Sequence, residues 1–180
     1  MDVEFRLPKP HELVGSSFHA PESVVVAFVA FGSQGAEAYL RVVDANGQAL
    51  GHKLISSGSS GEYGGPYALN IELTTTPTTP DGAVEYFRGS RPTGAPAVTV
   101  PVQFGTVIMV GYYTYSIHTV VAGETLWSIA ASEYKHGSGP AVLWPYIHQA
   151  NHHQISDPDV ITVGQRLFIP RSTDTEYDHG

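Results

Sequence analysis

The strongest constraint on how this chain folds lies in residues 115–170, where two short strand-like runs flank two stretches of helical periodicity. Ser116–Val120 alternates as a strand does, and Arg166–Ile169 supplies a second short strand. Between them, the turn signal Val121–Gly123 precedes Thr125, a residue type that caps helices well. The pattern predicts a strand, a loop, two helices, a loop and a strand, which together make a small α+β domain.

The two predicted helices are marked by their apolar faces, and Gly137–Gly139 breaks the chain between them. Glu124 is expected in the first turn of the first helix, where its charge complements the helix dipole. Pro145 favours a second helix that begins near Trp144, because proline fits the first turn of a helix. A start at Pro140 is the alternative, and it would bend the helix. The faces comprise Leu126, Ile129, Ala130 and Tyr134 in the first helix and Leu143, Tyr146, Ile147 and Ala150 in the second.

Residues 115–170 resemble a LysM domain over their whole length. LysM modules have a βααβ fold and bind glycans that contain N-acetylglucosamine, peptidoglycan and chitin among them. Two positions depart from the family pattern: Glu124 stands where aspartate is usual, and Thr162–Val163 precedes the glycine turn. The longer side chain at position 124 bears on affinity rather than on fold. The resemblance rests on Gly123–Ala130, Ala150–Asn151, Ile155–Ile161 and Gly164–Pro170.

The resemblance implies a glycan groove between the first loop and the loop before the last strand. Gly123 lets the ligand approach the backbone closely. Leu126 and Ile161 can meet the apolar face of the sugar, although both can equally belong to the core. The glycan-binding residues implied are Gly123, Glu124, Thr125 and Leu126 on the first wall and Asp157, Pro158, Asp159, Val160 and Ile161 on the second.

Several candidate residues also have a purely structural interpretation. Asp157 and Asp159 flank a proline, so turn capping is the more frequent role for them. Glu124 is expected to serve the helix start rather than the ligand. Trp127 and Trp144 are assigned to the core rather than to a sugar platform.

Residues 1–105 are rich in valine, threonine, tyrosine, glycine and proline, with turn signals at short intervals. The count of strand candidates is typical of an all-β immunoglobulin-like sandwich. Asn46–Gly47 is the strongest hairpin signal, and Pro101 is expected on a sheet edge because proline cannot donate to a ladder. The strand candidates are Val3–Leu7, Val24–Phe31, Tyr39–Asp44, Gln48–Ser56, Tyr67–Leu73, Val84–Phe87 and Ala97–Val102.

This first part of the chain is similar to the bacterial spore germination immunoglobulin-like domain. The resemblance implies a fold and a setting in the cell envelope, but no chemistry. It rests on Arg6–Pro10, Val43–Gly47, Gly65–Tyr67 and Val98–Val102.

The expected organisation is therefore two domains joined by a short apolar segment. The segment is too apolar for a free tether, so we expect it to pack between the domains or to extend a strand. The predicted ranges are 1–105 for the sandwich, 106–114 for the connector, 115–170 for the LysM domain and 171–180 for a disordered tail.

Charge and composition exclude several classes of partner. The net charge is −8 and no basic stripe is present, so neither nucleic acid nor an anionic membrane surface is expected. The chain has no cysteine, which excludes disulfides and thiolate metal sites. The longest apolar run, Val24–Phe31, is too short to span a membrane. The start of the sequence lacks a signal-peptide pattern, so either the protein is cytoplasmic or its leader has been removed from this chain.

No catalytic motif is recognisable, and the sequence predicts a protein that is not an enzyme. The acids Glu62, Glu72 and Glu85 show no pairing of the kind that a glycosidase needs. His148 and His152 are four residues apart beside His153, but a third metal ligand is missing, so no metal or other cofactor is expected.

The sequence thus predicts a noncatalytic protein of the cell envelope or extracellular space that binds peptidoglycan or another N-acetylglucosamine polymer. An envelope protein is a second candidate partner, through the sandwich. Two alternatives remain open: a LysM fold used for assembly, as in a spore coat, or a cytoplasmic ion sensor. An accessory module of a cell-wall hydrolase is a further rival.

Overall fold

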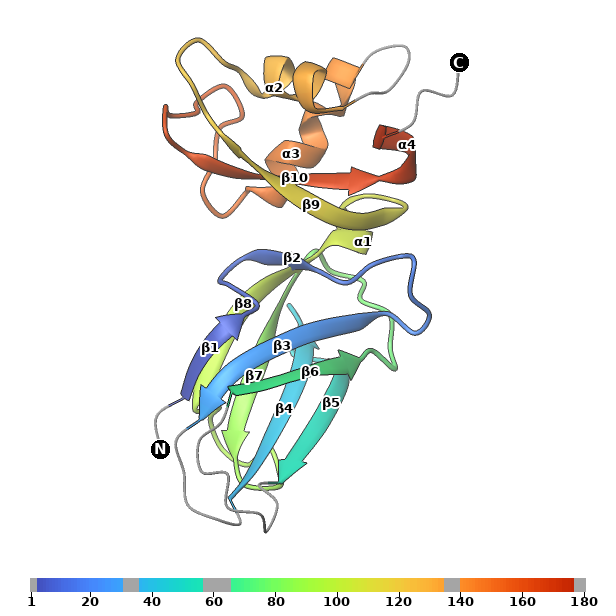
Figure 1. Ribbon diagram of the computed structural model, residues 1–180, viewed down its shortest axis with the longest axis vertical. Coiled ribbons are helices and arrows are strands. Elements are labelled where there is room, and N and C mark those ends of the chain that lie inside the picture. Colours follow the sequence, from blue (N-terminus) through green and yellow to red (C-terminus); the bar gives the residue numbers. More distant parts are fainter. Residues whose placement is uncertain (1–2, 31–35, 57–65, 135–139, 177–180) are drawn as a thin grey trace. The chain divides into compact units, whose positions relative to one another are not determined.

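The computed structural model divides into two compact units, and most of the regular structure in the residues that it describes is β-strand (Figure 1). The described residues are 3–30, 36–56, 66–134 and 140–176. Unit 1 comprises Met1–Val14 and His19–Phe104, and unit 2 comprises Gly15–Phe18 and Gly105–Gly180.

Unit 1 contains a five-stranded sheet with the strand order β2-β8-β7-β4-β5. The pairs are antiparallel except for β2, which runs parallel to β8. Short β2 gives no sequence signal of its own and was not predicted. The strands are β2 (Glu12–Val14), β4 (Glu37–Asp44), β5 (Ala49–Ser56), β7 (Asp81–Arg88) and β8 (Val98–Phe104).

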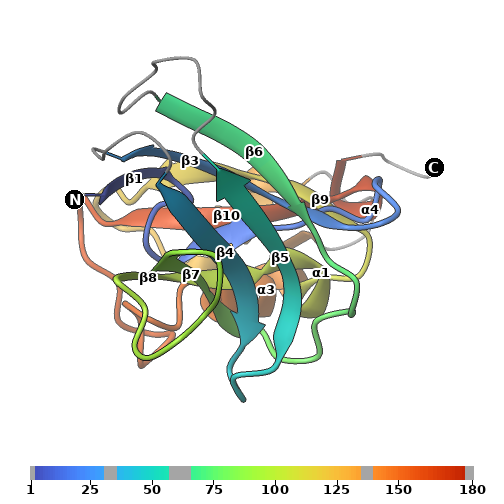
Figure 2. The same ribbon diagram turned by 90° about the horizontal axis from the view of Figure 1, so that it is seen from below.

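A second, antiparallel sheet of unit 1 has the order β1-β3-β6, formed by β1 (Val3–Leu7), β3 (Ser23–Ala30) and β6 (Pro66–Glu72). Figures 1 and 2 both show β3 and β6 as a layer over β4 and β5. The inward side chains of the two sheets meet, since the ring of Phe28 lies 5.6 Å from that of Tyr86. Both residues are almost completely buried, so the two sheets share one apolar core.

All seven expected strands are present, with ends shifted by a few residues. The Asn46–Gly47 hairpin is confirmed: β4 and β5 pair on either side of it, and Gly47 has a φ of 80° that suits glycine. Asp44 holds the turn, because its Oδ1 atom accepts hydrogen bonds from the amides of Asn46 and Gln48. Phe31, the predicted end of one strand, lies outside the described residues.

The expectation that Pro101 lies on a sheet edge is wrong, because β8 lies between β2 and β7. The Phe104 amide donates to the Pro80 carbonyl, on the β7 side of β8. Because backbone amides of a strand point alternately to its two sides, the nitrogen of Pro101, three residues earlier, points away from β7. On that side β2 begins to pair only beside Val102. The proline therefore costs the sheet no ladder hydrogen bond.

Unit 2 is built on a two-stranded antiparallel sheet of β9 (Tyr112–Thr119) and β10 (Arg166–Ser172). The predicted apolar face of the first helix is confirmed, with Leu126, Ile129, Ala130 and Tyr134 all buried. On the second helix, Ile147 and Ala150 are buried. The helical elements are α1 (Gly105–Ile108), α2 (Leu126–Glu133), the 3-10 turn η1 (Pro140–Leu143), α3 (Trp144–Ala150) and α4 (Thr173–Glu176).

The ends of the helices follow local sequence chemistry. Thr125 is the N-cap of α2, since its hydroxyl accepts from the Ser128 amide while the Ser128 hydroxyl accepts from the Thr125 amide. The start of α3 at Trp144, with Pro145 in its first turn, is confirmed. Glu124 precedes the cap, so its expected place in the first turn is wrong. The predicted break at Gly137–Gly139 lies outside the described residues.

Two segments differ from the expected organisation. Gly15–Phe18 belongs to unit 2, where the Ser17 amide and hydroxyl both donate to the Tyr112 carbonyl at 2.8 Å. Residues 171–176 were expected in a disordered tail, but β10 continues to buried Ser172 and α4 follows. Of the segment expected as a connector, residues 106–108 belong to α1, and β9 already begins at Tyr112. The domain boundaries themselves stay predictions.

Candidate functional site

A surface pocket of about 220 Å³ in unit 2 brings the two predicted walls together. The first wall contributes the cap and the first residue of α2, and the second wall contributes part of the loop before β10. Two tryptophans, one from α2 and one from α3, complete the lining. The pocket is lined by Thr125, Leu126, Trp127, Trp144, Pro158 and Asp159.

The first wall is shaped by a tight turn. The Glu124 amide donates to the Val121 carbonyl at 3.3 Å, and Gly123, with a φ of 85°, occupies the position where such a turn needs a positive φ. A Cβ at Gly123 would meet no atom within 4 Å, so glycine is favoured here by the backbone conformation and not by lack of space. Thr125, the N-cap of α2, follows this turn directly.

The second wall is organised by Asp157. Its Oδ1 atom accepts from the Asp159 amide at 2.9 Å, and its carbonyl accepts from the Val160 amide at 3.0 Å. The turn-capping interpretation of Asp157 is therefore confirmed. Asp159 and Val160 are both exposed, and Ile161 is half-buried.

Not every predicted site residue reaches the pocket. Leu126 lines it but is only 2% exposed, so it serves as core and pocket floor together. The predicted residues outside the pocket lining are Gly123, Glu124, Asp157, Val160 and Ile161.

The assignment of Trp127 to the core is wrong, because its side chain is 60% exposed. Trp144 is half-buried at the start of α3, and its ring centroid lies 6.3 Å from that of His148. Both indoles line the pocket, so sequence reasoning missed the aromatic part of the site. The sequence did hold a signal for Trp127: it directly follows the predicted first-wall residues 123–126.

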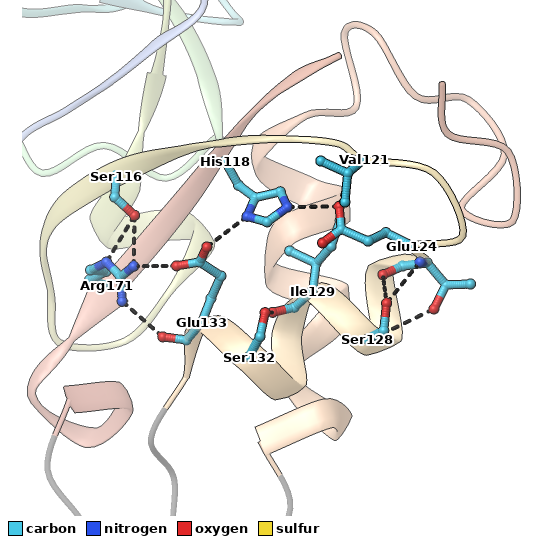
Figure 3. A network of polar contacts seen from close by, with 10 residues as sticks. Ser116, His118, Val121, Glu124, Ser128, Ile129, Ser132, Glu133 and Arg171 are labelled. Atoms are coloured by element: carbon cyan, nitrogen blue, oxygen red, sulfur yellow. Dashed lines mark hydrogen bonds and ion pairs between the residues drawn. The ribbon is translucent and has the colours of Figure 1, made fainter. Parts of the chain in front are cut away.

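A polar network connects Glu124 of the first wall to β9, α2 and β10 (Figure 3). His118, on β9, places Nε2 2.9 Å from Glu124 Oε2 and Nδ1 2.7 Å from Glu133 Oε1. The same Glu124 oxygen accepts from the Val121 amide at 2.8 Å. Burial lowers the pKa of His118, but its hydrogen bonds to Glu124 and Glu133 and their charges raise that pKa above its ordinary value. The pKa of Glu124 is lowered by its hydrogen bonds with His118 and with the Val121 amide.

Arg171 extends this network to β10. Its Nη2 atom lies 2.7 Å from Glu133 Oε2, and its Nη1 atom donates to the Glu133 carbonyl at 3.0 Å. Its Nε and Nη2 atoms also donate to the Ser116 hydroxyl. Sequence reasoning missed this network too, since its members come from β9, a loop, α2 and β10.

In the described part of the chain, no group of three or more histidine, cysteine, aspartate or glutamate side chains is arranged so that it could hold a metal ion. His148 Nε2 lies 3.1 Å from the Ile155 carbonyl and His152 Nδ1 lies 2.6 Å from the Gln149 carbonyl, so both bind their own helix end and loop. None of the helices in the described ranges has the length and apolarity needed to cross a membrane.

A small α+β unit with an aromatic-lined surface pocket has the form of a ligand-binding module. Residues 118–170 match the family model of the LysM domain, so the chain contains a LysM domain over these residues. LysM domains generally bind glycans that contain N-acetylglucosamine, such as peptidoglycan, and they are binding modules rather than catalytic ones. They typically occur in cell-envelope or extracellular proteins.

Two proteins of Mycobacterium tuberculosis, esterase MT1326 and esterase Rv1288, are each 48% identical to this chain over 58 residues. The matched segment is 32% of this chain and 11% of each relative. The esterase names describe those longer proteins, and the similarity to this chain covers only a short stretch of them.

Proposed function

We propose that this protein is a noncatalytic binding protein that recognises N-acetylglucosamine-containing glycan, peptidoglycan or a chitin-like polymer, through the pocket of its LysM domain. The observation that carries the proposal is the convergence of both walls and two tryptophans on one pocket. The family match supports the class of ligand.

The lining suits a sugar that carries an acetamido group. The exposed indole of Trp127 offers an apolar surface to a pyranose ring, and Leu126 offers a floor to the acetamido methyl. The exposed carboxylate of Asp159 can accept hydrogen bonds from sugar hydroxyls. Since the pocket is small, one module binds weakly and longer oligosaccharides bind better.

The nine residues taken from the family resemblance divide into three roles in this proposal. Thr125, Leu126, Pro158 and Asp159 contact the sugar together with the two tryptophans. Gly123, Val160 and Ile161 border the pocket, while Glu124 and Asp157 hold the two walls in shape.

For unit 1 we propose an immunoglobulin-like sandwich of the kind found in spore germination proteins. Support comes from the two sheets that share one core and from the Asn46–Gly47 hairpin. In this role the sandwich is a scaffold or a protein-interaction module of the cell envelope, and its outer strands can pair with a partner strand.

An NMR titration of the labelled chain with N-acetylglucosamine oligomers of increasing length tests the function. We expect shifts at the two walls and at the indole N–H groups of Trp127 and Trp144, with affinity that rises with oligomer length. Glucose oligomers, which lack the acetamido group, are the matched control. An absence of shifts at millimolar sugar would contradict the proposal and direct the search to assembly partners or ions.

A further inference from the structure

The Glu124 carboxylate has two polar partners beside the loop that forms the first wall. Its Oε2 atom accepts from the Val121 amide and also meets His118 Nε2. The next residue is Thr125, which both caps α2 and lines the pocket. A carboxylate with these two partners fixes the wall in place instead of reaching toward a ligand.

His118 lies between two carboxylates, as Figure 3 shows. A neutral imidazole carries one N–H, so it can donate to only one of them. In the neutral ring, the other nitrogen would turn a lone pair toward a carboxylate oxygen. Only the protonated ring donates to both Glu124 and Glu133, so the geometry fits the imidazolium form.

The formal charges of the network lead to the same protonation state. Glu124 and Glu133 carry two negative charges, and Arg171 with protonated His118 carries two positive charges. Among the described residues, the charged groups that act on the ring are Glu124 from the loop and Glu133 from α2, while Arg171 of β10 acts through Glu133. The residue opposite His118 on β10 is apolar Leu167. Loss of the histidine proton therefore leaves one unbalanced negative charge beside the first wall.

We infer that His118 and Glu124 are positioning residues of the glycan pocket, and that glycan affinity is coupled to protonation of His118. When the ring loses its proton, it can donate to only one of the two carboxylates, and the chain of contacts that ties the turn at Val121 to β9 and α2 is weakened. Thr125 then becomes less well placed, and binding weakens. This inference deepens the proposed function and rests on it.

The direction of the pH dependence follows from the two shifted groups. The raised pKa of His118 means that its tie is complete at low pH and is lost as pH rises through that pKa. The lowered pKa of Glu124 means that its contribution is lost only as pH falls through that pKa. Glycan affinity is therefore highest between the two pKa values and falls on the alkaline side, above the ordinary histidine pKa of about 6.5.

The test measures calorimetric affinity for an N-acetylglucosamine oligomer from about pH 5.5 to about pH 9, where histidines titrate. Wild type should lose about fivefold in affinity across this range, the low end of measured couplings between groups. His118→Gln should bind with the weaker affinity at every pH, because glutamine does not titrate. His152→Gln, which removes an exposed histidine of the same unit, should keep the wild-type profile.

A second measurement needs no glycan and no variant. NMR titration of wild type should show the Val121 amide shift following the ring nitrogens of His118. The inference is overturned if the Val121 amide shift does not change as the His118 ring titrates. It is also overturned if the His118→Gln variant still loses glycan affinity at alkaline pH. Binding with a flat pH profile contradicts this inference alone, whereas a wild-type protein that binds no glycan at any pH contradicts the proposed function.

Discussion

At the scale of single residues, Trp127 and Leu126 show how adjacent side chains on one helix take opposite roles. Successive residues of a helix are rotated by about 100°, so a residue next to the buried face can point outward. Leu126 is 2% exposed and Trp127 is 60% exposed. The sequence favoured the core for Trp127 and left Leu126 open between core and groove, and their places on the helix separate them.

Replacement of Trp127 by alanine tests the aromatic part of the pocket. We expect Trp127→Ala to weaken binding of an N-acetylglucosamine oligomer about tenfold, a loss of about 1.4 kcal/mol. The melting temperature should change little, because the indole is mostly exposed. Calorimetry and thermal unfolding measure the two effects. Val163→Ala, a change at another exposed apolar side chain, is the control and should leave the affinity unchanged.

At the scale of elements, Asn151 joins the end of α3 to β10. Its side chain is fully buried, and its Nδ2 atom donates to the carbonyls of Ile147 and Phe168 at 2.7 Å and 2.8 Å. Its Oδ1 atom accepts from the Phe168 amide at 2.8 Å. One amide side chain thus satisfies backbone groups of both elements.

We expect Asn151→Ala to lower the free energy of unfolding of unit 2 by about 3 kcal/mol, since several buried backbone groups lose their partner. Gln154→Ala should cost clearly less, because Gln154 is exposed although it donates to Asn151 Oδ1 and to the Arg166 carbonyl. Urea unfolding followed through NMR signals of unit 2 measures both. Equal losses in the two variants would show that the buried bonds of Asn151 add nothing special.

The elements that the sequence predicted correctly are those with a local signal. Thr125 and Pro145 mark helix starts, and Asn46–Gly47 marks a hairpin, through chemistry confined to a few neighbouring residues. Strand β2 escaped prediction because three residues carry no period and its parallel partner is distant in sequence. The network around His118 escaped for the same reason, since only the folded sheet brings its partners together.

At the scale of the whole molecule, the chain enters unit 2 twice. Gly15–Phe18 joins it from the N-terminal side, and the ring of Phe18 lies 5.0 Å from that of Tyr113. Together with the two hydrogen bonds from Ser17 to Tyr112, this segment supports the start of β9. Unit 2, which contains the LysM domain, is therefore not continuous in sequence.

A fragment of residues 105–180 should accordingly be less stable than unit 2 within the full chain, by about 2 kcal/mol for two hydrogen bonds and one ring pair. Hydrogen exchange of amides in β9 and β10 measures the local stability in both forms. The full-chain variant Ser17→Ala, which loses the hydroxyl bond alone, should fall between them. Equal protection in the fragment and the full chain would contradict this contribution.

Charge at the whole-molecule scale also shapes which glycans can bind. The net charge is −8, and the pocket lining includes Asp159 without a basic side chain. We expect the affinity for uncharged N-acetylglucosamine oligomers to change less than about twofold with salt. Oligomers of similar length that carry carboxylates should bind more weakly at low salt and gain affinity as salt rises. Calorimetry at two ionic strengths checks this, and tighter binding of the anionic oligomers at low salt would contradict it.

The chain contains two tryptophans, and both line the pocket. Light absorbed selectively by indole is therefore emitted from the pocket alone, although tyrosines are spread over both units. The unmodified protein carries its own optical reporter, whose emission colour and quenching register any ligand that displaces water from the two rings. Rapid mixing with oligosaccharides can thus follow association and release in real time without a label.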